Sequence, residues 1–243
     1  LDKKFASLVN KKTCLEIAKN IQLEKFVLTF NPKKQNLKIE DKVIADSCEA
    51  LIGAIYLDKG FSIVEKIILE RLSSNGREFD LKGYCVGSNG MTIFSEDDRL
   101  SNVKRLNLGG NRIGDIGAKL LAESPIFCKL QWIELGGNDL GPEGIRAICR
   151  STTLKKLKTL NVYRNLIKNQ GVRFIAKENC LSQLEELDLA QNEIGDEGVM
   201  ALAVSKLFPN LVALYMDNNF ASAEAKEDAK GCPNFRKLES LNL

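Results

Sequence analysis

The sequence predicts two domains, an all-α domain in residues 1–74 and an α/β solenoid in residues 75–243. Three observations support this prediction. The chain has 243 residues, which is enough for two ordinary domains. Apolar residues follow helical spacing through the first part, and a 27-residue repeat runs through the second. We expect the solenoid to have parallel strands on its concave face and helices outside.

The first domain contains three expected helices. Thr13 and Glu16 form a capping box at the start of the first one. The second is expected over residues 41–58, and the third over residues 61–72, because apolar residues recur there at helical intervals. Serine and glycine residues at 73–77 form the expected joint between the two domains.

The second domain repeats a unit of the form L-x-x-L-x-L-x-x-N. Its asparagine recurs every 27 residues from Asn111 to Asn219. Alternation along each strand places residues such as Leu106 and Leu108 inside and their neighbours outside. The asparagine has a short polar side chain that can satisfy backbone groups where the chain leaves the strand.

Each unit continues from its strand into a turn and a helix. Glycines stand in register in the second half of four units, at positions 117, 144, 171 and 198. A degenerate first repeat fills residues 76–102, with Tyr84 in place of the asparagine. Five repeats follow over 103–237, and residues 238–243 begin a truncated one. The first residue is not methionine and no polar cap follows the last, so we expect the chain to be cut at both ends.

Composition excludes several kinds of site. The chain has no histidine, which rules out Ser-His-Asp and Cys-His catalysis and histidine-ligated metal. Its seven cysteines never form C-x-x-C, so we expect free thiols in a reducing, cytoplasmic compartment. The longest apolar stretch is far shorter than the ~18 to 20 residues that span a membrane. A net charge of +3, all of it within residues 1–72, is too weak for a nucleic-acid coat.

Two carboxylates on the second expected helix form the candidate catalytic and metal site. Asp46 and Glu49 are three residues apart and therefore project from one helix face, which Ala50 and Gly53 continue. Adjacent carboxylates favour a divalent cation, and small neighbours leave room for a substrate. The alternative interpretation is a solvated helix face.

Residues 42–61, K-V-I-A-D-S-C-E-A-L-I-G-A-I-Y-L-D-K-G-F, resemble the second signature of bacterial ribonuclease III, I-x-A-D-x-x-E-A-L-I-G-A-I-Y-L-D-x-G-F. The resemblance covers about residues 1–72. It implies an all-helical, dimeric nuclease domain that cuts double-stranded RNA with Mg²⁺ in RNA processing. It also implies that Asp46 and Glu49 are the D-x-x-E half of a site whose other half is an E-x-x-x-D pair.

The chain departs from the ribonuclease III pattern in three ways. The family's first motif, E-F-L-G-D, would lie upstream of Leu1, and two carboxylates alone do not supply the ligand set that Mg²⁺ catalysis needs. The loop at 31–38 lacks the family's glycines, and repeats stand where the double-stranded-RNA-binding domain usually follows. The candidate phosphate contacts, equally consistent with a solvated loop, are Lys33, Lys34, Lys38 and Lys42.

The repeat unit, clearest at residues 184–198, is similar to leucine-rich repeats of the ribonuclease-inhibitor type. The resemblance covers about residues 76–243 and implies a horseshoe, and many such proteins bind other proteins on the concave face. Aromatic residues flanked by charges suit a protein contact, and acidic residues toward the C-terminal end disfavour RNA. The alternative is scattered surface aromatics with no partner. The expected protein-binding residues are Arg105, Trp132, Glu134, Tyr163, Glu186, Asp188, Tyr215 and Asp217.

Three functional hypotheses stay open at this point. The first is a Mg²⁺-dependent, ribonuclease III-type endoribonuclease fragment with a protein-binding array, double-stranded RNA as substrate and homodimerisation through the helical domain. The second is a leucine-rich-repeat interaction scaffold that carries an inactive nuclease remnant. The third is a fusion in which neither half serves the other. None of them involves a membrane.

Overall fold

The computed structural model describes Lys19, residues 76–84 and residues 86–243. The chain divides into two units, Leu1–Leu72 and Ser73–Leu243. Among the described residues, no helix is both long enough and apolar enough to cross a membrane.

Apart from Lys19, which is helical, the helices expected in residues 1–74 lie outside the described residues. The same holds for the candidate catalytic pair, Asp46 and Glu49, and for the four lysines proposed to contact phosphates. These expectations therefore stay predictions.

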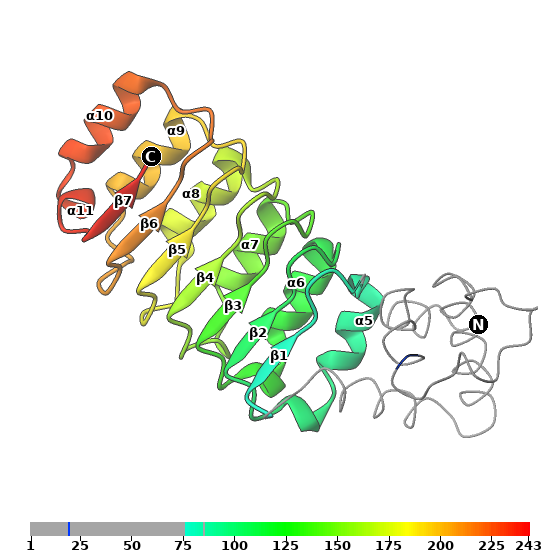
Figure 1. Ribbon diagram of the computed structural model, residues 1–243. Helices are drawn as coiled ribbons and strands as arrows, with labels where there is room; N and C mark the ends of the chain where they lie inside the picture. Colours follow the sequence, from blue (N-terminus) through cyan, green and yellow to red (C-terminus); the bar gives the residue numbers. More distant parts are fainter. Residues whose placement is uncertain (1–18, 20–75, 85) are drawn as a thin grey trace, which may run out of the picture. The chain divides into compact units, whose positions relative to one another are not determined.

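Seven short parallel strands form one sheet and follow one another across it in chain order (Figure 1). Each strand pairs with the strand 27 residues later, so that Leu106 pairs with Ile133 and Ile133 with Leu160. The strands are β1 (Glu78–Asp80), β2 (Arg105–Asn107), β3 (Trp132–Glu134), β4 (Thr159–Asn161), β5 (Glu186–Asp188), β6 (Ala213–Tyr215) and β7 (Ser240–Asn242). This uninterrupted ladder confirms the predicted α/β solenoid.

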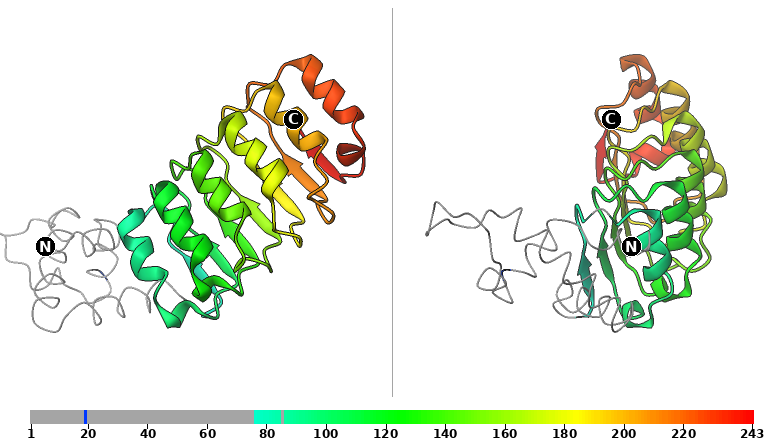
Figure 2. Two further views of the ribbon diagram at one scale, coloured as in Figure 1. Left: turned by 180° about the vertical axis from the view of Figure 1, so that it is seen from behind. Right: turned by 90° about the vertical axis from the view of Figure 1, so that its right-hand side faces the viewer.

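The helices form a second layer along one side of the sheet, as Figure 1 and the reverse view in Figure 2 show. They are α5 (Gly87–Phe94), α6 (Gly114–Glu123), α7 (Pro142–Cys149), α8 (Lys168–Glu178), α9 (Asp196–Ala203), α10 (Ala223–Gly231) and α11 (Pro233–Arg236). Two short 3₁₀ helices, η2 (Asp98–Leu100) and η3 (Pro125–Phe127), lead from α5 and α6 back to the next strand.

The hydrophobic core lies between the sheet and the helices. Leu106 and Leu108, at the two inward positions of one repeat, are 2% and 0% exposed. Ala118 and Leu121 cover them from α6 and are also fully buried. The predicted alternation of inward and outward strand positions is therefore confirmed, and burial of this apolar stripe is the main source of stability.

A ladder of buried asparagines ties each repeat to the next. The Oδ1 atom of Asn138 accepts hydrogen bonds from the backbone N–H groups of Asn111, at 3.0 Å, and Ile113, at 3.4 Å. Its Nδ2 group donates to the carbonyl oxygens of Leu108, at 2.9 Å, and Gly136, at 3.3 Å. Each asparagine thus satisfies backbone groups in its own repeat and the preceding one, as its position in the sequence predicted.

Glycine recurs near the start of the helices because side chains of the same and the preceding repeat pack closely against the backbone there. A Cβ atom at Gly117 would stand 2.6 Å from the Cβ of Ile113. At Gly171 it would stand 2.5 Å from the Cγ2 of Ile167 and 2.9 Å from the Cγ2 of Ile145 in the neighbouring repeat. These distances exclude a larger residue without movement of the core, which explains the register of the helical glycines.

The two ends of the array differ in burial. At β1, Tyr84 occupies the asparagine position and is buried, with 8% of its surface exposed. At β7, Leu241 and Leu243 are only partly buried, whereas their counterparts one repeat earlier, Leu214 and Met216, are 1% exposed.

Candidate protein interface on the strand face

We call the side of the sheet that points away from the helices the strand face. It carries three rows of residues, two from alternate strand positions and one from the residue two positions beyond. The first row is Glu78, Arg105, Trp132, Thr159, Glu186, Ala213 and Ser240. The second row is Asp80, Asn107, Glu134, Asn161, Asp188, Tyr215 and Asn242. The third row is Lys82, Gly109, Gly136, Tyr163, Ala190 and Asp217. The structure brings all eight residues predicted to bind protein into these rows.

Trp132 is held in place by its neighbour in the first row. The guanidinium carbon of Arg105 lies 4.4 Å from the centroid of the Trp132 ring, which is a cation–π contact. Arg105 also approaches Glu78 of the preceding strand, with 3.9 Å between Nε and Oε1. The half-buried indole is therefore preorganised on the surface, which lowers the entropy cost of using it in a contact.

The polar side chains of the second row have a structural role that the sequence analysis missed. In each of five successive strands, a side-chain oxygen accepts a hydrogen bond from the backbone N–H two residues later. The bonds are Asp80 with Lys82 at 3.0 Å, Asn107 with Gly109 at 3.1 Å, Glu134 with Gly136 at 2.5 Å, Asn161 with Tyr163 at 2.9 Å and Asp188 with Ala190 at 2.9 Å. Each carboxylate of this row uses one oxygen for this bond, so its second oxygen is left for other contacts on the strand face.

Two carboxylates of the second row are energetically unfavourable in their charged form. Burial raises the pKa of Asp188, the N–H of Ala190 partly offsets this, and the charges of Asp217 and Glu186 raise the pKa further. Burial likewise raises the pKa of Glu134, and the N–H of Gly136 acts against it. These acids therefore do not stabilise the folded chain through charge, which favours a role toward a ligand.

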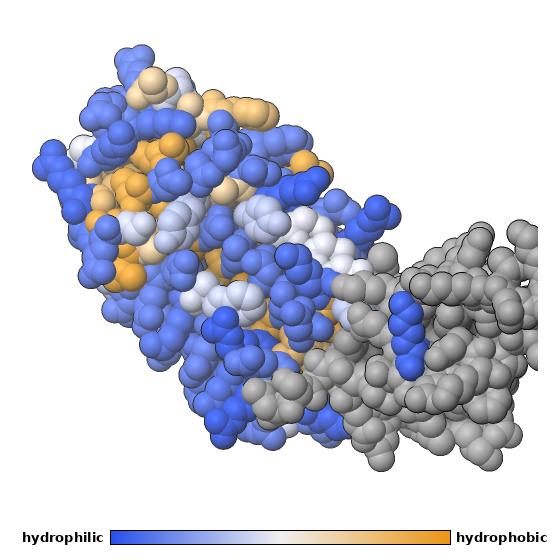
Figure 3. All heavy atoms as spheres, viewed as in Figure 1, coloured by the Kyte–Doolittle hydropathy of each residue, from blue (hydrophilic) through white to orange (hydrophobic). Residues whose placement is uncertain are grey.

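A hollow opens on the strand face over the second and third strands. Its volume is about 690 Å³, and its floor is the backbone of two Gly-Gly pairs, 109–110 and 136–137. The Tyr163 ring leans over Gly136, where a Cβ atom would overlap it. The other residues lining the hollow are Lys82, Asn107, Arg112, Trp132, Glu134, Asp139, Arg164, Asn165 and Leu166. On the face seen in Figure 3, hydrophobic surface gathers over the C-terminal repeats, and the middle of the array is mostly polar.

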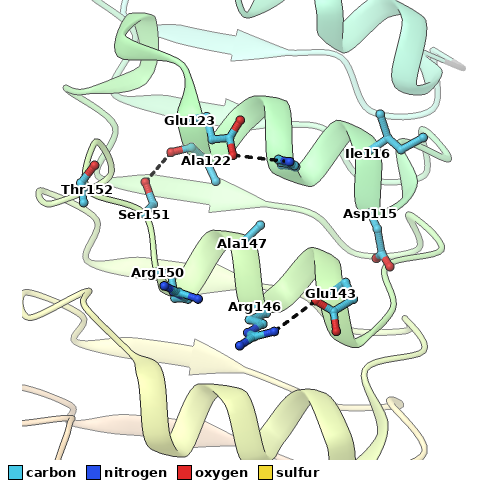
Figure 4. Close-up of a pocket in the computed structure, with 11 residues that line it drawn as sticks. Asp115, Ile116, Ala122, Glu123, Glu143, Arg146, Ala147, Arg150, Ser151 and Thr152 are labelled. Atoms are coloured by element: carbon cyan, nitrogen blue, oxygen red, sulfur yellow. Dashed lines mark hydrogen bonds and ion pairs between the residues drawn. The ribbon is translucent and has the colours of Figure 1, made fainter.

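A second hollow, also about 690 Å³, lies on the helix side between α6 and α7 (Figure 4). Its charged groups are mostly paired with each other. Lys119 lies 3.9 Å from Glu123, and Arg146 lies 3.6 Å from Glu143. Arg146 also donates to Glu178 at 2.9 Å, which lowers the pKa of that carboxyl. Because these charges are satisfied internally, this hollow offers less to a ligand than the strand face does.

Thiol and metal chemistry finds little support in the described part of the chain. Cys128, Cys149, Cys180 and Cys232 are free thiols. Burial raises the pKa of the Cys149 thiol to about 12, so that it stays protonated and unreactive. No group of three or more acidic or cysteine side chains among these residues is placed to hold a metal ion.

Family models match two separate parts of the chain. Residues 1–75 match the Ribonuclease-III-like family. Residues 99–122, 128–149 and 182–203 match the leucine-rich-repeat family. The chain joins a ribonuclease-III-like region to a leucine-rich-repeat array. Both resemblances expected from the sequence are therefore confirmed.

Curated relatives match the ribonuclease-III-like region. Ribonuclease 3 of Pelagibacter ubique is 64% identical over 75 residues, which are 31% of this chain and 34% of that protein. Ribonuclease 3 of Methylocella silvestris is 33% identical over 70 residues, covering 29% and 30% of the two chains. Ribonuclease 3 of Nitrobacter winogradskyi is 39% identical over 77 residues, covering 30% and 29%. The chain spans about a third of the length of these relatives.

Two solved structures align with the array. An internalin of Listeria monocytogenes matches 60% of this chain and 36% of its own, with 23% identity and a TM-score of 0.41. The C-terminal domain of tropomodulin from Caenorhabditis elegans matches 60% and 89%, with 15% identity and a TM-score of 0.45. Both TM-scores are below 0.5, so the solenoid assignment rests on the strand register and the asparagine ladder.

Proposed function

We propose that residues 1–74 belong to a ribonuclease III-type endoribonuclease that hydrolyses phosphodiesters of double-stranded RNA. The observation that carries this proposal is the 64% identity to Ribonuclease 3 of Pelagibacter ubique over 75 residues. The chain spans 34% of that relative, so the activity needs parts of the nuclease domain beyond the matched segment.

Asp46 and Glu49 are the proposed ligands of Mg²⁺ in this enzyme. Both are hard oxygen donors, which Mg²⁺ prefers, and their spacing places them on one face of the expected helix. Bound Mg²⁺ would neutralise negative charge on the phosphate and the leaving oxygen. Lys33, Lys34, Lys38 and Lys42 are proposed to contact the RNA backbone, in a cytoplasmic enzyme that dimerises through this domain.

The nuclease proposal is tested in a chimera. The segment of Pelagibacter ubique Ribonuclease 3 that precedes the match is joined upstream of Leu1, and cleavage of a long RNA duplex is measured with Mg²⁺. We expect cleavage that Asp46→Asn or Glu49→Gln reduces by at least 100-fold, while Asp58→Asn, at the expected helix end, has little effect. A chimera that does not cleave, or cleavage indifferent to the Asp46 and Glu49 changes, would reject the assignment.

We further propose that the leucine-rich-repeat array binds a protein through its strand face. Three features support this: the preorganised Trp132, the half-buried acids whose charged form burial disfavours, and the hollow on the same face. Aromatic and arginine side chains at the centre of a surface are the groups that contribute most to protein contacts.

The array proposal is tested with a partner recovered by pull-down. We expect Trp132→Ala to weaken its binding by at least tenfold. Ile116→Ala is the matched control, because Ile116 is an apolar residue 69% exposed on the helix side. Recovery of no partner, or equal binding by both variants, would remove the support for this interface.

An interaction scaffold with an inactive nuclease remnant is the second candidate function. The array accounts for the larger share of the chain, residues 73–243. A chimera without cleavage together with a partner sensitive to Trp132→Ala is the result that this alternative predicts.

A further inference from the structure

The hollow on the strand face is lined by three cationic side chains and by the carboxylates of Glu134 and Asp139. The cations are Lys82, Arg112 and Arg164, and none of the three forms an ion pair with another described residue. The charge of Lys82 acts on Glu134, whereas the two arginines have no such partner among the described residues. Elsewhere on the array, arginines are commonly paired, as Arg146 is with Glu178 at 2.9 Å and Arg173 with Glu197 at 2.9 Å. Two unpaired guanidinium groups around one hollow favour a carboxylate, since each presents a planar fork of donors.

The floor of the hollow lets a ligand approach the backbone. The two Gly-Gly pairs leave Gly110 exposed and Gly137 half-buried, with no side chain above either. Later repeats carry Arg164 and Gln191 at the same position with φ of 52° and 54°, so the turn itself does not require glycine. Among the five full repeats, only the first two carry Gly-Gly at this position. The absence of side chains at Gly110 and Gly137 is what opens the hollow between Trp132 and Tyr163.

The C-terminal end of the strand face carries charge of one sign. In the three rows defined above, strands β5 to β7 and the residues that follow them contain no lysine or arginine within the described chain. They contain Glu186, Asp188 and Asp217, whose charges repel each other. The strand face is therefore polarised, with cations and carboxylates side by side over β1 to β4 and carboxylates as the sole charged groups of the rows over β5 and β6.

We propose that the strand face recognises an extended segment of a protein partner that carries one acidic and one basic residue four positions apart. The acidic side chain enters the hollow beside Arg112 and Arg164, and the basic side chain lies over Asp188 and Asp217. This inference rests on the proposed protein-binding function of the array and adds the chemistry and direction of the bound segment.

The spacing follows from the geometry of the sheet. The hollow is centred over β2 and β3, and the acidic cluster lies over β5 and β6, three strands away. Parallel strands lie ~4.8 Å apart, which gives about 14 Å. An extended segment advances ~3.3 Å per residue, so four residues cover about 13 Å when the segment crosses the strands. Side chains four positions apart also lie on the same side of an extended segment.

The test uses random ten-residue peptides without tryptophan, displayed and selected on the full chain. We expect the enriched peptides to pair an acidic with a basic residue four positions apart. A synthetic peptide of the enriched sequence should change the fluorescence of Trp132, the chain's only tryptophan, and bind at least tenfold more tightly than versions with both residues acidic or both basic.

Two charge changes sharpen this test. Arg164→Glu should weaken the selected peptide at least tenfold, and Asp188→Asn, which keeps an acceptor for the Ala190 N–H, should weaken it several-fold. Arg173→Glu on the exposed side of α8 makes the same charge change away from the hollow and should have no effect. No enrichment, uniformly basic peptides, or equal effects of Arg164→Glu and Arg173→Glu would overturn the inference. If a protein partner still bound less tightly to the Trp132→Ala variant, this inference would be rejected but the proposed protein-binding function of the array would stand.

Discussion

The inward and outward positions of the same strands obey different rules. Leu106, Ile133 and Leu160 occupy one inward position in three repeats and are all 2% exposed or less. The outward residues immediately before them are arginine, tryptophan and threonine. Because the backbone register is the same for both, the difference must come from what each side contacts.

The fold constrains the inward strand positions more tightly than the outward ones. The inward positions must fill a core of constant width and are therefore limited to leucine-like residues. The outward positions are free to differ, and on the strand face they differ in charge from one end of the array to the other. Some outward residues still serve the fold, as the hydrogen bonds within the second row show.

The largest expected effect is at an inward position. Leu160→Ala removes a fully buried side chain in the middle of the array and should lower the free energy of unfolding by about 3 to 5 kcal/mol. Thr159→Ala, one residue earlier on the strand face, should change it by less than about 0.5 kcal/mol. Urea unfolding followed by circular dichroism measures both. Similar losses for the two variants would remove the distinction between the two sides.

The next effect concerns the asparagine ladder. Asn138→Ala leaves the buried N–H groups of Asn111 and Ile113 without the oxygen they contact, which should cost about 2 to 4 kcal/mol. Asn107→Ala removes one local bond to the N–H of Gly109 on the partly exposed face and should cost about 1 kcal/mol. Thermal unfolding of the two variants measures both losses of stability. An Asn138 variant as stable as the Asn107 variant would show that the ladder is not a main source of stability.

A smaller gain is expected where a side chain occupies left-handed backbone. Gln191 has a φ of 54°, and the equivalent Gly110 and Gly137 have φ of 70° and 64°. Gln191→Gly should therefore raise the free energy of unfolding by about 0.5 kcal/mol, since relief of backbone strain exceeds the entropy cost of glycine. The reverse swap, Gly110→Gln, should lower it by a similar amount. Denaturant midpoints of both variants test this, and shifts of the same sign would contradict it.

The sequence predicted the fold well because the 27-residue period fixes inward side chains, asparagines and strand register together. The local bonds of the second row were missed, although alignment of the repeats shows an acid or amide at 80, 107, 134, 161 and 188. The hollow could not be predicted in the same way. Its floor is visible as two Gly-Gly pairs, but the lean of Tyr163 over Gly136 depends on packing between repeats. For Asp46 and Glu49 the prediction rests on the motif and the family match.

We expect the negative charge of the strand-face carboxylates to serve a ligand and not the fold, and the stability of Asp188→Asn as a function of pH tests this most directly. Asparagine keeps an oxygen for the Ala190 N–H and already occupies the equivalent positions 107 and 161. Burial raises the folded pKa of Asp188 above its ordinary 3.8. Between these two pKa values the native protein binds more protons than the unfolded chain, so it loses stability as pH rises through this range. We expect the variant to unfold at a higher temperature than the original chain at neutral pH, and this advantage to vanish as pH falls below about 3.8. A variant less stable at neutral pH, or an advantage that does not change with pH, would show that the charge of Asp188 does not act against the fold.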